Sequence, residues 1–487
     1  MRLGYLEQWT AVPGTVLEWT VLADSELVDS PVPPTGNQLM HLAAARTAWL
    51  AVMFDVPGPI DRRALEIAFA VWTTRHDALR CGFVRADGPG PVSMRVGAGI
   101  RLEARPDVPV GTADELRTVL GARFDEACDP FRFAPYTLAA ISRPGGSTVV
   151  CAFDHAVCDA WSMTVAATEL DQLYRAARAG GRPGARTAAA RLPAAGSFLA
   201  YCAAESATQI SRDDPRLRRW RDFLGEAGND VPHFPDDLGL APGTTAPMAG
   251  DVRTILDAAD ADSLELRCHD DEYSVFAALL AVVGQAVAGQ SGRARTLLLA
   301  PVHTRREPLL HNVFGWLVGN APIVVDTDAV DFTASARAAD DSIRAGRVLA
   351  EVPPARLLGA MGSDLRLNRA DLFTVSFVDY RRLPGGSRYP GSASAPRNCV
   401  QLSRGGQADD VQMWFSRTDD GLSLRTRFPR TALAQARIRE FLDRLTAGVQ
   451  AVRRADVRRS GLSYNGSGRS IGVAVGPYVS NPRRIER

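Results

Sequence analysis

The chain has 487 residues, of which 46% are hydrophobic, and its formal net charge at pH 7 is +1. The length predicts two to four domains, and the balanced charge gives no indication of a nucleic acid or an anionic membrane surface as a partner. All 56 basic residues are arginine, because the sequence contains no lysine. This composition excludes Schiff-base chemistry and the phosphate-binding loop, which both need a lysine.

Seven cysteines are scattered along the sequence without a Cys-x-x-Cys pair, at positions 81, 128, 151, 158, 202, 268 and 399. Their odd number and their spacing predict neither a disulfide framework nor a zinc site. We expect them to be small buried side chains in a reducing cytoplasm. No signal peptide is expected, and the longest apolar run, residues 275–288, is too short to cross a bilayer and predicts a buried helix.

The first half begins with a predicted strand at residues 50–56, followed by a helix that Asp61 would cap. Residues 75–83, Arg-His-Asp-Ala-Leu-Arg-Cys-Gly-Phe, follow that helix and lead into another strand. His76 lies in this stretch. A further helix is predicted over residues 112–124.

Residues 147–165 combine a strand and a helix around a polar turn. Their apolar, β-branched start predicts a buried strand, and the spacing from Trp161 onward predicts a helix that runs to about Arg178. The turn carries His155 and Asp159. An imidazole held in such a loop can take a proton near neutral pH, so this turn is the candidate site of chemistry.

Other interpretations of the turn use the same residues. His155 could be a surface histidine, with Asp159 serving only to cap the helix. A metal site is a weaker interpretation, because no third ligand and no His-Glu-x-x-His motif lie nearby. A third interpretation makes Cys158 a nucleophile.

The middle of the chain predicts a connection and two helices. Residues 176–195 are rich in Ala, Gly, Arg and Pro and lack apolar periodicity, which indicates an exposed connection between two halves. Helices are expected at residues 197–208 and 214–224, and the second carries a cluster of arginines. A solvated helix face is the simpler interpretation of this cluster, and a docking patch for the phosphates of coenzyme A or of a carrier protein is the alternative. The arginines are Arg216, Arg218, Arg219 and Arg221.

The second half repeats the order of strand, buried helix, strand and loop, without a short-period repeat. Its loop contains Arg305 and Arg306 ahead of residues 314–323, Phe-Gly-Trp-Leu-Val-Gly-Asn-Ala-Pro-Ile. A hairpin turn is predicted at residues 420–421, and a closing helix at residues 431–452.

The end of the chain predicts a disordered tail over residues 456–487, because it is rich in arginine and glycine and shows little periodicity. A Gly-x-Ser-x-Gly match at residues 468–472 contains Ser470. No strand precedes this match and no helix follows it, so we interpret it as chance rather than as a nucleophile elbow.

These landmarks, in this order, resemble the condensation domains of peptide synthetases and the related CoA-dependent acyltransferases. Residues 154–160 resemble the family motif His-His-x-x-x-Asp-Gly, with Asp154 in place of the first histidine and Ala160 in place of the glycine. Residues 75–83 resemble the motif Arg-His-x-x-Leu-Arg-Thr-x-Phe, and residues 314–323 resemble the stretch Gly-x-Phe-Val-Asn-Thr-Leu-Pro-Leu.

The resemblance covers residues 1–452 and is greatest to free-standing polyketide-associated acyltransferases and stand-alone condensation enzymes. It implies an α/β fold of two similar chloramphenicol-acetyltransferase-like subdomains, each a two-layer α+β sandwich, set in a V with a tunnel between them. On this basis residues 1–185 and 197–455 would form the two subdomains, and residues 186–196 would form the linker.

The resemblance also implies roles for single residues. His155 would be catalytic, and Asp159 would be structural and held by Arg305, which fits the family arginine better than Arg306 does. No metal site is expected. The resemblance assigns no role to Cys158, and it implies that His76 is structural rather than catalytic. The expected tunnel-lining residues are Asp154, Ala160, Trp161, Trp316 and Ser376.

The implied activity is transfer of an acyl or aminoacyl group from a phosphopantetheine thioester, on a carrier protein or coenzyme A, to a small-molecule hydroxyl or amine. The product would be an ester or amide of natural-product, antibiotic or lipid biosynthesis in the cytoplasm, made without a tightly bound cofactor. The alternative is a catalytically silent condensation-like domain that recruits a partner protein. An epimerising relative is disfavoured, because that chemistry usually keeps both histidines.

Overall fold

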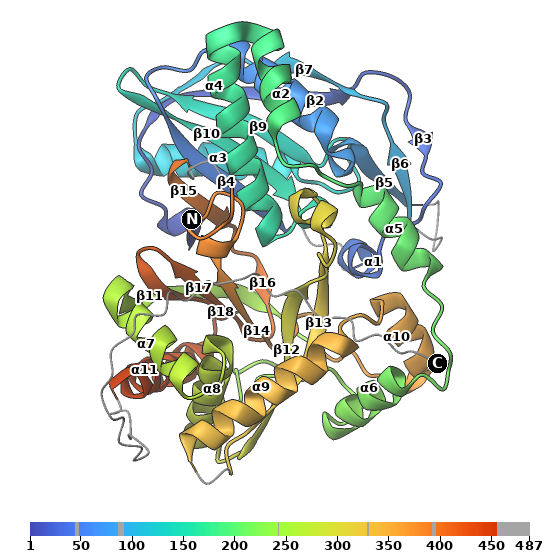
Figure 1. Ribbon diagram of the computed structural model, residues 1–487, viewed down its shortest axis with the longest axis vertical. Helices are drawn as coiled ribbons and strands as arrows, with labels where there is room; N and C mark the ends of the chain where they lie inside the picture. The colour runs from blue at the N-terminus through green and yellow to red at the C-terminus, as the bar shows by residue number, and fades with distance from the viewer. Residues whose placement is uncertain (44–47, 86–91, 242, 329–330, 392–395, 455–487) are drawn as a thin grey trace, which may run out of the picture.

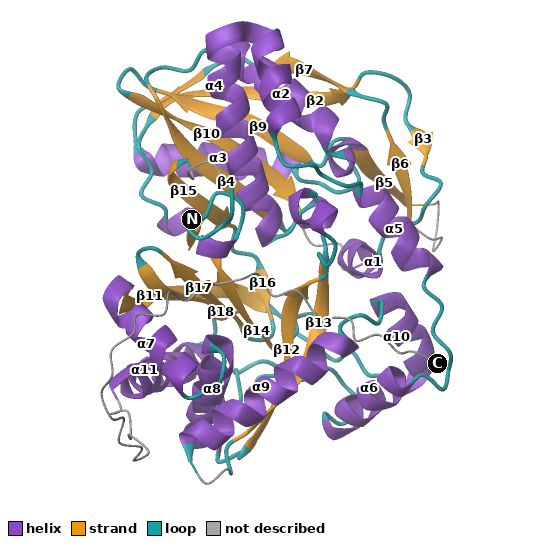
Figure 2. Cartoon of the chain, in the orientation of Figure 1, coloured by secondary structure: helices purple, strands orange, loops and turns teal. Residues whose placement is uncertain are grey.

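The computed structural model describes residues 1–487 except 44–47, 86–91, 242, 329–330, 392–395 and 455–487. Within the described residues, the chain forms two units along the long axis of the molecule, each a sheet with helices packed on it (Figures 1 and 2). The predicted α/β class with two subdomains is therefore confirmed. The predicted tail, including Ser470, lies outside the described residues.

The first sheet has the strand order β1-β15-β4-β10-β9-β2-β7, with β8 beside β2. Its strands are β1 (Arg2–Tyr5), β2 (Gly14–Ala23), β4 (Trp49–Pro57), β7 (Ile100–Ala104), β8 (Val108–Val110), β9 (Tyr136–Ser142), β10 (Gly146–Asp154) and β15 (Arg397–Ser403). A smaller sheet contains β3 (Val28–Asp29), β6 (Val92–Val96) and β5 (Cys81–Arg85). The helices of this half are α1 (Gly36–Ala43), α2 (Arg62–Arg75), α3 (Ala113–Ala127), α4 (Ala160–Arg191) and α5 (Phe198–Ala207).

Successive side chains of β4 point to opposite sides of the sheet, and side chains on both sides are buried. Leu50 and Phe54 belong to the core formed with α2 and α4. Trp49 and Met53 belong to the core formed with α3, where Trp49 packs edge-on against Phe124 at 5.0 Å between ring centroids. The central strands of the first sheet are thus held between two helical layers.

The second sheet has the strand order β13-β12-β14-β17-β18-β11-β16. Its strands are β11 (Ala246–Asp257), β12 (Arg295–His303), β13 (Val318–Asp326), β14 (Thr374–Asp379), β16 (Gln407–Ala408), β17 (Gln412–Thr418) and β18 (Gly421–Pro429). Its helices are α6 (Pro215–Glu226), α7 (Ala258–Asp270), α8 (Val275–Ser291), α9 (Phe332–Leu349), α10 (Pro354–Met361) and α11 (Ala432–Arg454).

The two faces of the second sheet differ in polarity along β17 and β18. Phe415 and Leu424 are fully buried in the core formed with α8 and α11. Trp414 and Arg425, which alternate with them, are on the opposite face, and Arg425 Nη1 donates a hydrogen bond to Ser403 Oγ of β15 at 3.0 Å. This polar face of the second sheet therefore contacts the first sheet at β15.

The predicted connection is one of two points at which the structure differs from the sequence analysis. Helix α4 does not end near residue 178 but continues to Arg191, across a kink at Gly180 and Gly181, where the φ angle of Gly181 is 58°. Most of the expected linker, residues 186–196, is therefore helical. The periodicity was too weak to indicate this helix, because alanine forms most of its buried side, as Ala185 does.

The second difference concerns the division between the two halves. Residues 397–403 fall inside the expected second subdomain, 197–455, but β15 pairs antiparallel with β4 in the first sheet. Gln401 lies opposite Val52 in that pairing. The two units of the structure therefore cannot be separated by a single cut in the sequence.

Features set by local sequence agree with the predictions. The buried helix expected at residues 275–288 is α8, and the hairpin turn joins β17 and β18 with Gly421 at a φ angle of 135°. Asp61 caps α2 by accepting a hydrogen bond from Ala64 N at 2.9 Å. All seven cysteines are buried and free.

Of the helices in the described ranges, none alone is long and apolar enough to span a bilayer; only α7 and α8 together, bent by 97°, have the length and composition.

A buried ionic cluster fastens the loop before β11 to the loop before β17. His233 Nδ1 lies 2.9 Å from Asp410 Oδ2, and His233 Nε2 lies 3.2 Å from Asp230 Oδ2. Asn368 donates a further hydrogen bond to Asp230. Burial opposes the charge of His233, but the hydrogen bonds and charges of the two carboxylates prevail and raise its pKa. The imidazolium, which donates from both nitrogens, is therefore favoured up to a higher pH than in a free imidazole.

We expect this cluster to stabilise the fold more at low than at high pH. Because the folded-state pKa of His233 is raised, its ionic contribution is fully present below the unfolded pKa of about 6.5 and is lost as pH rises through the folded value. The loss of unfolding free energy in His233→Ala, measured in urea, should therefore shrink between pH 6 and pH 9. His269→Ala, which changes an exposed histidine of α7, is the control. A pH-independent loss in His233→Ala would contradict the assignment.

Candidate active site

The predicted catalytic turn joins β10 to α4 through a short 3-10 helix, His155–Val157. Asp154, the last residue of β10, caps that short helix by accepting from Ala156 N at 2.8 Å. Asp159 caps α4 by accepting from Ser162 N at 2.8 Å. Two local caps therefore fix the path of the chain on both sides of His155.

Asp159 and Arg305 form a buried bidentate ion pair. Arg305 Nη1 lies 2.6 Å from Asp159 Oδ2, and Arg305 Nη2 lies 3.0 Å from Asp159 Oδ1. Burial favours the neutral acid, but Arg305 and the backbone donors prevail and lower the pKa of Asp159. Arg306, the other candidate, is exposed and pairs with Glu351.

The pair joins the two halves, because Asp159 begins α4 and Arg305 follows β12. Leu317 N donates to Asp159 Oδ2 at 3.1 Å, and Gly315 N donates to Ser162 Oγ at 3.0 Å. A Cβ atom at Gly315 would lie 2.3 Å from the buried Phe198 ring, so only glycine fits at this approach. The loop that carries residues 314–317 is thus held on the first half.

This loop presents Trp316 to His155. The two rings lie 4.3 Å apart between centroids at an angle of 49°. His155 is half-buried, and its Nδ1 is buried without a hydrogen-bond partner among the described residues. Burial, reinforced by the charge of His41, lowers the pKa of His155 to about 4. The imidazole is therefore neutral at physiological pH and is able to accept a proton.

The sequence analysis missed His41, which lies on α1 next to the catalytic turn. His41 Nε2 is 3.0 Å from Asp154 Oδ1, and Asp154 is fully buried. The His41 ring lies 5.8 Å from Trp316 and 6.2 Å from His155 between centroids. Burial raises the pKa of Asp154, although His41 opposes this effect. The one signal for His41 in the sequence was Asp154 in place of the first histidine of the family motif, because a buried carboxylate needs a hydrogen-bond donor.

The other predicted lining residues are also near the junction of the halves. Ala160 is the first residue of α4, and Trp161 Nε1 donates to His311 O of the second half at 2.8 Å. The Trp161 ring also lies 5.4 Å from the Arg305 guanidinium. Ser376 is buried on β14, opposite Trp414 of β17. Ala160 and Trp161 are thus next to the ion pair, whereas Ser376 lies in the second sheet.

Other candidates from the sequence do not have the features of catalytic groups. The thiol of Cys158 is fully buried, and burial raises its pKa well above the usual value, so it stays protonated. His76 Nε2 lies 2.7 Å from Glu169 Oε2 inside the first core, which is a structural contact. Among the described residues, no group of three potential metal ligands is found.

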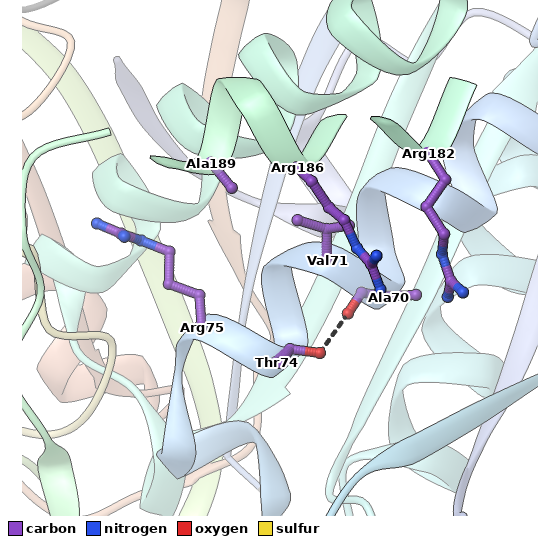
Figure 3. A pocket seen from close by; sticks show the side chains of 7 residues that line it. All are labelled: Ala70, Val71, Thr74, Arg75, Arg182, Arg186 and Ala189. Carbon is purple, nitrogen blue, oxygen red and sulfur yellow. Dashed lines mark hydrogen bonds between the residues drawn. The ribbon is translucent and has the colours of Figure 1, made fainter. Parts of the chain in front are cut away.

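A cleft of about 380 Å³ lies apart from this site, between α2 and the part of α4 after its kink (Figure 3). Its lining residues are Ala70, Val71, Thr74, Arg75, Arg182, Arg186 and Ala189. They include no histidine, cysteine or carboxylate, so this cleft offers no acid or base for catalysis. On α6, Arg216 pairs with Asp214, while the other arginines of that helix are exposed.

Comparisons with known proteins add independent findings. The sequence model of the family described as "Condensation domain" matches residues 38–454. Acyltransferase PapA3 of Mycobacterium tuberculosis is 24% identical over 473 residues, covering 93% of this chain and 97% of that protein. Trehalose-2-sulfate acyltransferase PapA2 of the same species is 24% identical over 458 residues, covering 90% and 94%. The solved structure of PapA2 acyl transferase matches with a TM-score of 0.81 and 21% identity, over 93% of this chain and 100% of that chain.

Breaking the buried pair should destabilise the protein strongly. Asp159→Asn leaves the guanidinium of Arg305 buried and unpaired, so we expect the free energy of unfolding to fall by about 3–5 kcal/mol. Urea unfolding followed by circular dichroism measures this change. Asp222→Asn, at an exposed position on α6, should change the value by less than about 0.5 kcal/mol. Wild-type stability of Asp159→Asn would refute a structural role for the pair.

Removing the charge of His41 should raise the pKa of His155. His41→Gln keeps a donor for Asp154 but removes a group that contributes, after burial, to the low pKa of His155. Titration of the His155 ring by NMR, assigned from its missing signal in His155→Ala, gives the direct measurement. The same titration in His269→Gln should be unchanged. A constant or lower pKa of His155 in His41→Gln would rule out this influence.

Proposed function

The chain belongs to the condensation-domain family, and we propose that it transfers an acyl group from a phosphopantetheine thioester to the hydroxyl or amine of a small molecule. It is an acyltransferase, as its relatives PapA3 and PapA2 are. The donor in this proposal is acyl-CoA or a loaded carrier protein, and the reaction takes place in the cytoplasm. The observation that carries the proposal is a neutral imidazole, His155, held against Trp316 where the two halves meet.

The acceptor is the less defined substrate. PapA2 is named for trehalose 2-sulfate, which supports a sugar hydroxyl as the first acceptor class to test and an ester as the product. We place donor and acceptor in a tunnel between the two units, with β15 counted in the first unit. Its proposed lining includes Asp154, Ala160, Trp161, Trp316 and Ser376.

His155 serves as the general base in this mechanism. As the acceptor oxygen forms a bond to the thioester carbonyl carbon, its proton passes to Nε2, since Nδ1 is buried. The tetrahedral intermediate then collapses, the C–S bond breaks, and the imidazolium returns the proton to the leaving thiolate. Because the thioester is already activated, no covalent enzyme intermediate is needed.

The structural residues act on His155 indirectly. The Asp159–Arg305 pair holds the loop that carries Trp316, and this ring limits the orientations that His155 can adopt. His41 and Asp154 fix the opposite side of the turn. Such positioning removes the need to reorganise the base during the reaction.

Replacing His155 separates an enzyme from a silent recruitment domain. His155→Ala should fold normally but lose about 10²–10⁴ in turnover, the usual contribution of a general base, while donor binding is retained. Cys158→Ser is the control and should keep most of the activity, because the Cys158 thiol remains protonated.

The assay is mass spectrometry of acyl transfer from acyl-CoA and from a loaded carrier protein to sugars, other alcohols and amines. Unchanged turnover of folded His155→Ala would overturn the base assignment. If the wild type transfers no acyl group but binds a partner protein tightly, the recruitment function replaces the enzymatic one.

A further inference from the structure

Arg425 differs from the other buried arginines of the described chain, because it has no carboxylate partner there. Arg305 pairs with Asp159, Arg381 pairs with Asp379 at 2.8 Å, and Arg417 pairs with Glu265 at 2.7 Å. Arg425 is 5% exposed, yet within the described ranges no carboxylate oxygen lies within 4.0 Å of its guanidinium. A buried charge without a counter-ion is strongly unfavourable.

The contacts of Arg425 compensate this charge only in part. Its Nη1 donates to Ser403 Oγ at 3.0 Å and to Gly4 O at 3.4 Å. The guanidinium also lies 5.4 Å from the centroid of the Tyr5 ring and 4.5 Å from that of Trp414. Cation–π contacts stabilise a buried guanidinium by less than its desolvation costs. Nε is buried and has no acceptor in the described part of the chain.

Paired strands of the first sheet connect the hydrogen-bond partner of Arg425 with the catalytic turn. Ser403, which accepts its hydrogen bond, lies opposite Leu50 of β4, and Leu50 lies opposite Phe153 of β10. Neighbouring strands are about 4.8 Å apart, so Ser403 is about 10 Å from the strand end that carries His155. The low pKa of His155, caused mainly by burial, is also lowered by the charge of Arg425.

On the second sheet, Arg425 lies in one row with Trp414 and Ser376. Trp414 lies directly opposite Arg425, and Ser376 of β14 lies opposite Trp414. All three side chains therefore occupy one row on the polar face of the second sheet, which contacts the first sheet at β15. Arg425 is thus a fixed cation on the same side of the sheet as the proposed tunnel.

We propose that Arg425 binds an anionic group of the substrate, a sulfate or carboxylate, and thereby orients the reacting molecule toward His155. This inference rests on the proposed function. A guanidinium donates parallel hydrogen bonds to such oxyanions, and the rings of Tyr5 and Trp414 hold it in place before binding. The anionic group belongs to the acceptor or to the acyl chain of the donor, and these two sources are separated experimentally.

Inorganic sulfate is a probe that does not depend on catalysis. Sodium sulfate, compared with sodium chloride at equal ionic strength, should raise the melting temperature of the wild type in a saturable manner. Arg425→Gln should lose the saturable part and keep only the general stabilisation by sulfate, and Arg425→Lys should keep a weaker response. Arg439→Gln, an exposed arginine of α11, should respond like the wild type. Equal saturable responses in wild type and Arg425→Gln would overturn the proposal.

Kinetics on the wild type keep the proposal testable even if Arg425→Gln does not fold. Sulfate should inhibit competitively against the substrate that carries the anionic group, and an absence of inhibition would contradict the assignment. In folded Arg425→Gln, KM should rise about 10- to 100-fold for an acceptor or donor with the anionic group and less than about threefold for its neutral analogue. Glucuronic acid and a glucose sulfate against glucose test the acceptor, and succinyl-CoA against butyryl-CoA tests the donor.

One further variant separates this proposal from the proposed function. His155→Ala should bind sulfate like the wild type, because His155 acts only on the reacting proton. Sulfate binding that requires Arg425 in a protein without any transferase activity would support the anion site while refuting the enzymatic role. Transferase activity that Arg425→Gln leaves unchanged for every anionic substrate would support the enzymatic role and refute the anion site.

Discussion

The ion pair of Asp159 and Arg305 is the contact on which the arrangement of both halves depends. Each charge is almost completely removed from solvent, so each needs hydrogen bonds from several directions. Asp159 receives them from Arg305, Ser162 and the backbone of Leu317. Satisfying one buried carboxylate therefore fixes the start of α4 and the loop from the second half at the same time.

Burial is the main cause of the low pKa of His155, and nearby positive charges lower that pKa further. Asp159, the nearest acid on α4, is neutralised by Arg305, while Asp154 is occupied by His41. His41 and Arg425 contribute positive charge from α1 and β18, which disfavours a second cation at His155. A ring kept neutral is free to accept the proton of the acceptor, and its low pKa makes it a weaker base than one whose pKa lies near the operating pH.

Whether the sequence predicted a feature depended on how far apart in the chain the residues that determine it lie. The cap of α2 at Asp61 and the turn at Gly421 follow from a few adjacent residues, and the family motifs placed Asp159 with Arg305. His41 and Arg425 were not found, because each contacts residues that are far away in the chain: Asp154 for His41, and Gly4 and Tyr5 for Arg425. The helical segment after Gly181 was missed because an alanine-rich side gives little contrast between its faces.

The crossing of β15 into the first sheet has a consequence for how the chain reaches its native state. Until residue 403 has been synthesised, β4 lacks its neighbour on one side and exposes unpaired backbone groups beside apolar side chains. At a synthesis rate of about 5–20 residues per second, this edge stays open for tens of seconds after β4 itself is complete. The nascent first half therefore carries an open sheet edge, which is closed late by a strand that arrives with the second half.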